Sequence, residues 1–142
     1  MDNVLSLLGL ARKAGRLAIG EEPVGAAARA RDARLILLAR DASDNSARRA
    51  ARFAEAGDCL LARIPADKVA LGAAVGRASC AMLAVTDVSF ADAIGKRLAA
   101  LDAARYGALS ERLRLKADRA AARRRAQQRR DKRAGQSKPR KT

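Results

Sequence analysis

The sequence contains no histidine, so it lacks the commonest general base and metal ligand at neutral pH. Its two cysteines, Cys59 and Cys80, do not have a metal-binding spacing, and we interpret them as buried thiols of a reducing compartment. No apolar run reaches about 18 residues, so no transmembrane helix is expected. At the N-terminus an acid precedes the apolar run and bases follow it, the reverse of a signal peptide. We therefore expect a cytoplasmic protein that does not bind a membrane.

Phosphate-binding and catalytic motifs are also missing. The chain has neither a GxxxxGK[ST] loop nor a GxGxxG turn after a strand. Gly72 and Gly76 flank a helix end, which is typical of close packing rather than of a phosphate cradle. Paired aspartates could hold Mg²⁺ or serve as acid and base, but each of the four candidates fits a cap or turn better: Asp41, Asp44, Asp58 and Asp87. No nucleophile has a plausible base, so we expect neither an enzyme nor a cofactor.

Negative charge becomes scarce toward the C-terminus. The chain has 30 Lys and Arg against 15 Asp and Glu, a net charge of +15. Residues 1–106 hold 16 and 12 of these, a net of +4, whereas residues 107–142 hold 14 and 3, a net of +11. This difference predicts a globular domain over 1–106 and a basic tail over 107–142. A field of one sign indicates a polyanion partner. Nucleic acid is the usual partner of this kind, and an acidic membrane surface or an acidic protein is the less favoured alternative.

The stretch that starts at Gly20 predicts a turn, a helix and a buried strand. Glu21 and Glu22 suit a helix N-terminus, and Pro23 is tolerated only in a first turn. The five apolar residues Leu35–Ala39 show no polar alternation, which is typical of a strand covered on both faces. A glycine turn that opens a helix exposes backbone N–H groups to phosphates or base-edge acceptors. The alternative is an ordinary structural unit of an α/β domain.

Helices and strands alternate along the rest of the chain with short connections. This alternation is typical of a three-layer α/β/α domain with a largely parallel central sheet. The first expected helix is capped by Asp2 or Asn3 and has Arg12 and Lys13 at its C-terminal end. The other expected helices are Val24–Ala30, one from the 42–46 region to Ala56, Lys68–Val75 and Val88–Ala104, and the expected strands are Arg16–Ile19, Leu35–Ala39, Cys59–Ala62 and Ala81–Val85.

The composition changes from Leu109 onward. The segment is rich in Ala, Arg, Gln and Lys, which are good helix formers, but it has no continuing apolar stripe. We therefore predict a fraying helix that nothing holds against the core, followed by disorder through GQSKPRKT. A solubilising tail without a specific partner is the alternative interpretation.

The motifs LLGLARKAGRLAIGEEPV, ARLILLARDASDNS and LGAAVGRASCAMLAVTDVSFADAI resemble the bacterial YlxQ-type RNA-binding proteins of the ribosomal-protein L-seven-Ae and L-thirty-e superfamily. The resemblance covers about residues 4–101. It implies an α/β/α sandwich whose mixed sheet has about four strands. It also implies that RNA is contacted by the start of the second helix, here Ile19–Ala26, and by the loop after the fourth helix, here Gly76–Cys80.

The chain departs from the kink-turn readers of that superfamily. Those proteins carry Asn-Glu-x-x-Lys after the glycine, and the three named positions fall here on Glu22, Pro23 and Ala26. Their apolar-acidic-apolar loop falls on Arg77-Ala78-Ser79. Pro23 has no side-chain acceptor and Ala26 has no cation, so the departures argue against the usual kink-turn readout.

We therefore expect a non-enzymatic, monomeric RNA-binding protein that acts on ribosomal or other structured RNA, with ribosomal or ribonucleoprotein proteins as further partners. The domain would recognise RNA shape and the tail would contact phosphates. A protein–protein adaptor whose tail binds RNA non-specifically is the alternative, and an enzyme is the third choice. The candidate RNA-binding residues are Gly20, Glu21, Glu22, Arg40, Gly76 and Arg77 in the domain, and Arg123, Arg124, Arg125, Arg129 and Arg130 in the tail.

Overall fold

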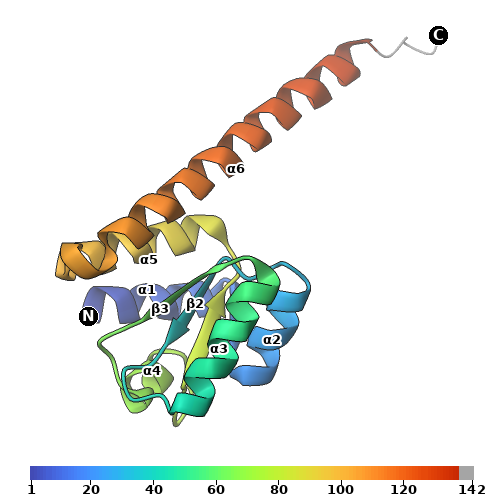
Figure 1. Cartoon of the computed structure of the whole chain (residues 1–142). Helices are drawn as coiled ribbons and strands as arrows, with labels where there is room; N and C mark the ends of the chain where they lie inside the picture. Colours follow the sequence, from blue (N-terminus) through green and yellow to red (C-terminus); the bar gives the residue numbers. More distant parts are fainter. Residues whose placement is uncertain (138–142) are drawn as a thin grey trace.

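The computed structural model describes residues 1–137 (Figure 1). A four-stranded sheet is flanked by helices, and the last helix continues beyond the domain as a long rod. In chain order the elements are α1 (Asp2–Lys13), β1 (Leu17–Ile19), α2 (Glu21–Arg29), β2 (Leu35–Leu38), α3 (Asp44–Gly57), β3 (Leu60–Arg63), α4 (Lys68–Ala74), β4 (Met82–Val85), α5 (Val88–Leu101) and α6 (Ala103–Ser137).

The sheet is mixed, with the strand order β1-β4-β2-β3. Only β2 and β3 are parallel, whereas β4 runs antiparallel to both of its neighbours. The mixed sheet implied by the resemblance is thus confirmed, and the largely parallel sheet predicted from the alternation is wrong. The connection between β3 and β4 contains the seven-residue helix α4. The chain leaves β3 at Arg63 and starts β4 at Met82 at the same end of the sheet, so this connection is not a parallel crossover.

The strand register defines two ends of the sheet. Ile19, Leu38 and Met82 lie at one end, which we call the Gly20 end. Leu17, Leu35 and Val85 lie at the other end, which we call the Thr86 end. Between the ends every residue of β2 and β4 is buried, as expected for strands covered on both faces. The two ends therefore present separate surfaces, held apart by the length of the strands.

The first part of α6 is anchored to the domain, and the prediction that nothing holds this segment is wrong. Leu113 is fully buried and Tyr106 is 4% exposed, with Leu109 packed beside them. A Cβ added at Gly95 of α5 would lie 2.7 Å from Leu113 Cδ1, which shows how closely the two helices approach. The apolar residues are spaced at three and four positions, so they form one helical stripe. The boundary predicted after Tyr106 falls inside α6, and a division of the chain there stays a proposal.

The ends of α5 and α6 also differ from the prediction. The fifth helix ends at Leu101 rather than Ala104, because Asp102 interrupts it and accepts a hydrogen bond from the backbone N–H of Arg105 at 3.1 Å. Asp102 thereby caps the start of α6. At the C-terminal end, Gly135–Ser137 belong to α6, contrary to the predicted disorder. The remainder of that prediction, residues 138–142, lies outside the described residues.

Candidate nucleic-acid interface

Gly20 precedes α2 in a conformation that suits glycine. Its φ is 97°, and its N–H donates to the carbonyl of Met82 at 3.1 Å. The first N–H groups of a helix have no acceptor within the helix, and Pro23 has no N–H at all. The N–H groups of Glu21 and Glu22 are therefore the donors that this turn can offer to an anion.

The side chain of Glu21 is used inside the protein. One carboxylate oxygen accepts a hydrogen bond from Ser46 Oγ at 2.8 Å, and the other accepts from Arg49 Nη1 at 2.7 Å. Both partners belong to α3, so the contacts hold the start of α2 against that helix. Of the two acids predicted to meet RNA, Glu21 has its carboxylate engaged by α3, whereas the Glu22 side chain is exposed.

The loop after α4 folds back tightly on that helix. A Cβ added at Gly72 would lie 2.8 Å from backbone atoms of Arg77 and Ser79, so Gly72 is a packing glycine, as predicted. Gly76 has φ 74° and is exposed. A Cβ at Gly76 would lie 3.0 Å from the guanidinium of Arg12. Arg12 of α1 therefore lies beside Gly76, and the exposed Arg77 follows Gly76 in the chain.

Arg12 is a candidate site residue that the sequence alone did not reveal. In the sequence it stands near the end of the first helix, where a cation also fits the helix dipole, and this purely local explanation concealed its second position. Only the packing of α1 against α4 brings its guanidinium to the loop after α4.

Cys80 joins this loop to the Gly20 turn. Its thiol donates to the carbonyl of Met82 at 3.1 Å, the same carbonyl that accepts from Gly20 N–H. Burial raises the pKa of the Cys80 thiol, so the sulfur stays protonated at neutral pH. The two predicted RNA-contacting segments thus meet at one backbone carbonyl.

Arg40 lies at the same end of the sheet, just after β2. Its side chain is 65% exposed and lies 3.9 Å from the carboxylate of Asp67, a weak surface pair. Its carbonyl accepts a hydrogen bond from Arg63 at 2.8 Å. Arg40 is thus positioned by its backbone, and its guanidinium remains accessible.

The positions of the missing kink-turn motif line a shallow hollow of about 530 Å³. Glu22, Pro23 and Ala26 form one side of it, and Arg29 and Phe53 are among the other lining residues. The Phe53 ring packs on α2, since a Cβ added at Gly25 would lie 3.0 Å from it. The hollow therefore keeps the place of the motif but not its hydrogen-bonding side chains.

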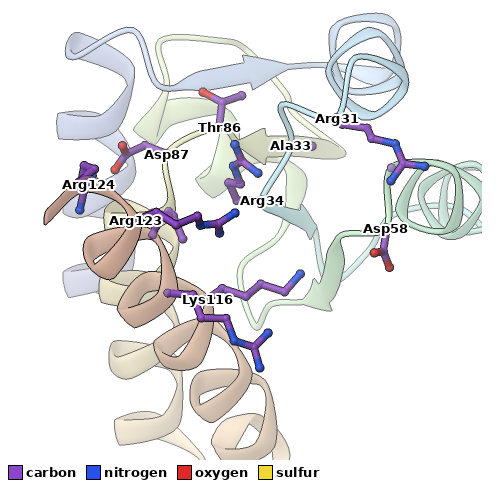
Figure 2. Close-up of a pocket in the computed structure, with 13 residues that line it drawn as sticks. Arg31, Ala33, Arg34, Asp58, Thr86, Asp87, Lys116, Arg123 and Arg124 are labelled. Carbon is purple, nitrogen blue, oxygen red and sulfur yellow. The ribbon is translucent and has the colours of Figure 1, made fainter. Parts of the chain in front are cut away.

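The predicted tail residues lie elsewhere. Arg123 and Arg124 line a groove at the Thr86 end, next to Thr86 and Asp87 (Figure 2). Arg125, Arg129 and Arg130 are exposed on α6. The structure thus brings Gly20, Gly76 and Arg77 together at one end, and it separates them from the arginines of α6.

Two of the four aspartates considered for metal binding accept hydrogen bonds from the backbone. Asp87 accepts from the N–H of Phe90 at 2.9 Å and caps α5, and Asp41 accepts from the N–H of Lys68 at 2.8 Å. Within residues 1–137 no three His, Cys, Asp or Glu side chains gather as metal ligands would. None of the helices in this part of the chain has the length and apolar character needed to cross a bilayer.

The chain is similar to known proteins in both sequence and structure. It is 36% identical over 90 residues to the RNA-binding protein YlxQ of Bacillus subtilis (strain 168), a match that covers 61% of this chain and 85% of that protein. A solved structure from Bacillus halodurans, titled as a protein with unknown function, superimposes with a TM-score of 0.62 at 26% identity. The superposition covers 67% of this chain and 95% of that one. Residues 2–94 match the model of the ribosomal protein L7Ae/L30e/S12e/Gadd45 family, and the chain belongs to this family.

Proposed function

We propose that the protein is a non-enzymatic RNA-binding protein that recognises the shape of a ribosomal or other structured RNA at its Gly20 end. The basic part of α6 adds affinity through phosphate contacts. The protein acts as a monomer in the cytoplasm, beside the proteins of a ribonucleoprotein particle.

One observation carries this proposal. The Gly20 turn, the loop Gly76–Cys80 and the guanidinium of Arg12 converge at one end of the sheet, in a chain related to an RNA-binding protein. Backbone N–H groups and exposed arginines are the donors that phosphate oxygens and base edges accept. The glycines let a backbone approach closely, and Arg12 and Arg77 supply charge on the same surface.

The first experiment tests this surface in the full-length chain. The variant Arg12→Gln/Arg77→Gln should bind an RNA hairpin with an internal loop roughly tenfold more weakly, because a charge-assisted hydrogen bond contributes roughly 1.5 kcal/mol. Its affinity for a single strand of the same composition should change much less. Gly20 is left intact, since a side chain is strained at its positive φ.

The matched control is Arg52→Gln/Arg112→Gln, which removes the same charge from two exposed positions without side-chain partners in residues 1–137. It should leave the preference for the hairpin unchanged, and thermal melts should show both variants folded. Equal losses in the two variants would mean that the Gly20 end has no special role. If the parent chain binds neither RNA, the adaptor hypothesis takes its place.

The second experiment concerns kink-turns. The parent should discriminate only weakly between a kink-turn and the same RNA with its G·A pairs disrupted. The triple variant Glu22→Asn/Pro23→Glu/Ala26→Lys restores the family motif on the surface of the hollow. It should improve discrimination by about 1–3 kcal/mol, the size of a bidentate polar contact to a base. Strong discrimination by the parent would show that other groups read the RNA.

A further inference from the structure

The Thr86 end of the sheet carries a groove of about 610 Å³ that the family domain alone does not form. One wall is α6, with Lys116, Arg119 and Arg123. The other wall comes from the segment before β2, with Arg31 and Arg34, and from the ends of α3 and β4. In Figure 2, Lys116 and Arg123 reach from α6 toward the side that carries Arg34. Two distant parts of the chain thus supply cations to one space.

The basic face of α6 continues its apolar stripe. Leu109 and Leu113 face the core, and the same helical spacing of three and four residues leads to Lys116, Ala120 and Arg123. The stripe therefore changes from apolar to basic where the helix leaves the core and reaches the groove. The buried part of the helix fixes the direction in which these cations point.

The positive charge of the groove is not neutralised by the protein. Six cations line it, against two carboxylates, Asp58 and Asp87. Asp87 is occupied as the cap of α5. None of the six cations has a side-chain hydrogen bond or ion pair within residues 1–137, whereas Arg49 and Arg114 on other surfaces are both paired. Unpaired like charges held together repel one another, and a polyanion relieves that repulsion.

The backbone conformation of two residues in the groove is a second, independent observation about this surface. Arg31 and Asp58 are the only non-glycine residues among 1–137 with positive φ, at 59° and 49°, and both line this groove. Each follows the end of a helix, a position that glycine takes most easily. The left-handed conformation costs roughly 1 kcal/mol for a residue with a Cβ. An arginine at such a position supplies charge despite this cost.

We propose that this groove binds the phosphate backbone of RNA, as a second contact surface separate from the Gly20 end. The inference rests on the proposed RNA-binding function. The lining residues include no aromatic side chain, so the groove offers no stacking platform for a free nucleotide. Cations on two facing walls instead suit a run of phosphates, which position a nucleic acid without reading its sequence.

The test compares full-length variants in their binding to an RNA hairpin at several salt concentrations. Arg34→Gln/Arg123→Gln removes one cation from each wall. It should weaken binding roughly tenfold and flatten the log–log salt slope by about 1.4 to 1.8, as expected for two lost phosphate contacts. The charge-matched control Arg52→Gln/Arg112→Gln should flatten the slope by less than half as much. Unlike the Arg12/Arg77 variant, the groove variant should weaken hairpin and single strand equally.

Two single variants exploit the backbone. Arg31→Gly and Asp58→Gly both place glycine at a positive φ, so both should melt at or above the parent temperature. Their effects on RNA affinity should be opposite, because one removes a cation from the groove and the other removes a carboxylate. Binding should weaken for Arg31→Gly and tighten for Asp58→Gly. Changes of the same sign would overturn the proposal.

The outcomes separate this proposal from the proposed function. If the parent binds RNA and the groove variant behaves like the control, only the groove proposal fails. If the parent binds no RNA, the RNA-binding function fails and the groove proposal with it. Polyglutamate serves as a second probe. If the groove variant loses polyglutamate binding but keeps its RNA affinity, the groove is a site for an acidic protein and the RNA assignment is overturned.

Discussion

The two ends of the sheet meet the solvent with different chemistry. At the Gly20 end the important groups are backbone turns, with φ 97° at Gly20 and 74° at Gly76, joined by Arg12 and Arg77. At the Thr86 end they are long cationic side chains on α6 and on the segment before β2. Backbone donors have fixed positions and can recognise a shape, whereas flexible cations contact any phosphate backbone. This difference supports the proposed division between recognition at one end and affinity at the other.

The largest expected effect is unfolding of the domain, which would abolish the surfaces at both ends of the sheet. Leu37 lies fully buried in the centre of β2, and Leu37→Asp would place an unpaired carboxylate between the covered faces of the sheet. We expect unfolding or a loss of several kcal/mol in the free energy of unfolding. Chemical denaturation followed by circular dichroism measures this. A cooperative transition near that of the parent would contradict the two-sided burial of the strand.

A truncation tests the C-terminal part of α6 separately from the two ends of the sheet. A chain ending at Ala126 loses seven of the Lys and Arg residues but keeps every residue that lines the groove. If about half of these cations meet phosphates, the salt slope for single strands should flatten by roughly 2.5, and affinity near 0.15 M salt should fall about a hundredfold.

The same truncation should leave sequence preference and melting temperature nearly unchanged, because the anchors Tyr106 and Leu113 remain. A truncation at Tyr106 would instead remove Leu113 from the core. An unchanged salt slope for the chain ending at Ala126 would leave the end of α6 as a solubilising extension or a site for an acidic protein.

A third variant shifts α6 through a contact that lies outside the residues of both proposed binding surfaces. Gly95→Leu inserts a side chain where even a Cβ lies 2.7 Å from Leu113 Cδ1, so α6 must shift away from α5. Overpacking of this kind costs about 1–3 kcal/mol. The groove should open and the salt slope should flatten, while the preference for structured RNA at the Gly20 end persists. Amide hydrogen exchange should show faster exchange over the first turns of α6.

Gly107→Ala is the control for that variant. A Cβ added at Gly107 meets no atom within 4 Å, so alanine should stabilise α6 by about 0.5–1 kcal/mol through helix propensity. Loss of the hairpin preference in Gly95→Leu, with the fold intact, would show that the two ends are not independent.

The smallest expected loss of stability concerns the hydrogen bond that ties α6 to β3. Tyr106 donates its hydroxyl proton to the carbonyl of Arg63 at 2.7 Å, and Tyr106→Phe should cost about 1 kcal/mol at neutral pH. Burial raises the pKa of Tyr106 above its ordinary value of about 10. The folded state therefore favours the neutral phenol, and its contribution is present below about pH 10 and lost as pH rises through the folded value. Urea titrations should show a smaller alkaline loss for the Phe variant.

Much of the domain could be predicted because local signals and packing agree there. The uninterrupted apolar run at β2, the capping Ser43 and Asp67, and the glycine before α2 each specify one structure. The direction of β4 could not be predicted from the alternation, because it depends on α4 staying at one end of the sheet. Arg12 was missed for a similar reason, since only tertiary packing brings it to Gly76.

The anchoring of α6 had a visible signal that was not used. Tyr106, Leu109 and Leu113 are spaced as an apolar helical face, but the basic composition that follows concealed the stripe. The groove had no comparable signal. Its two walls are separated by about half of the chain, and charge counts along the sequence do not show which cations share a surface.

The buried Leu113 also fixes the rotational position of the part of α6 that lies outside the core. An α-helix turns by about 100° per residue, so one residue inserted between Leu113 and Lys116 would swing every later cation by that angle and leave the charge unchanged. The number of residues between the anchor and Arg123 is thus constrained, whereas the identity of the intervening exposed residues is not. In related chains with the same α6, we expect substitutions in this interval to be common and single-residue insertions or deletions to be rare.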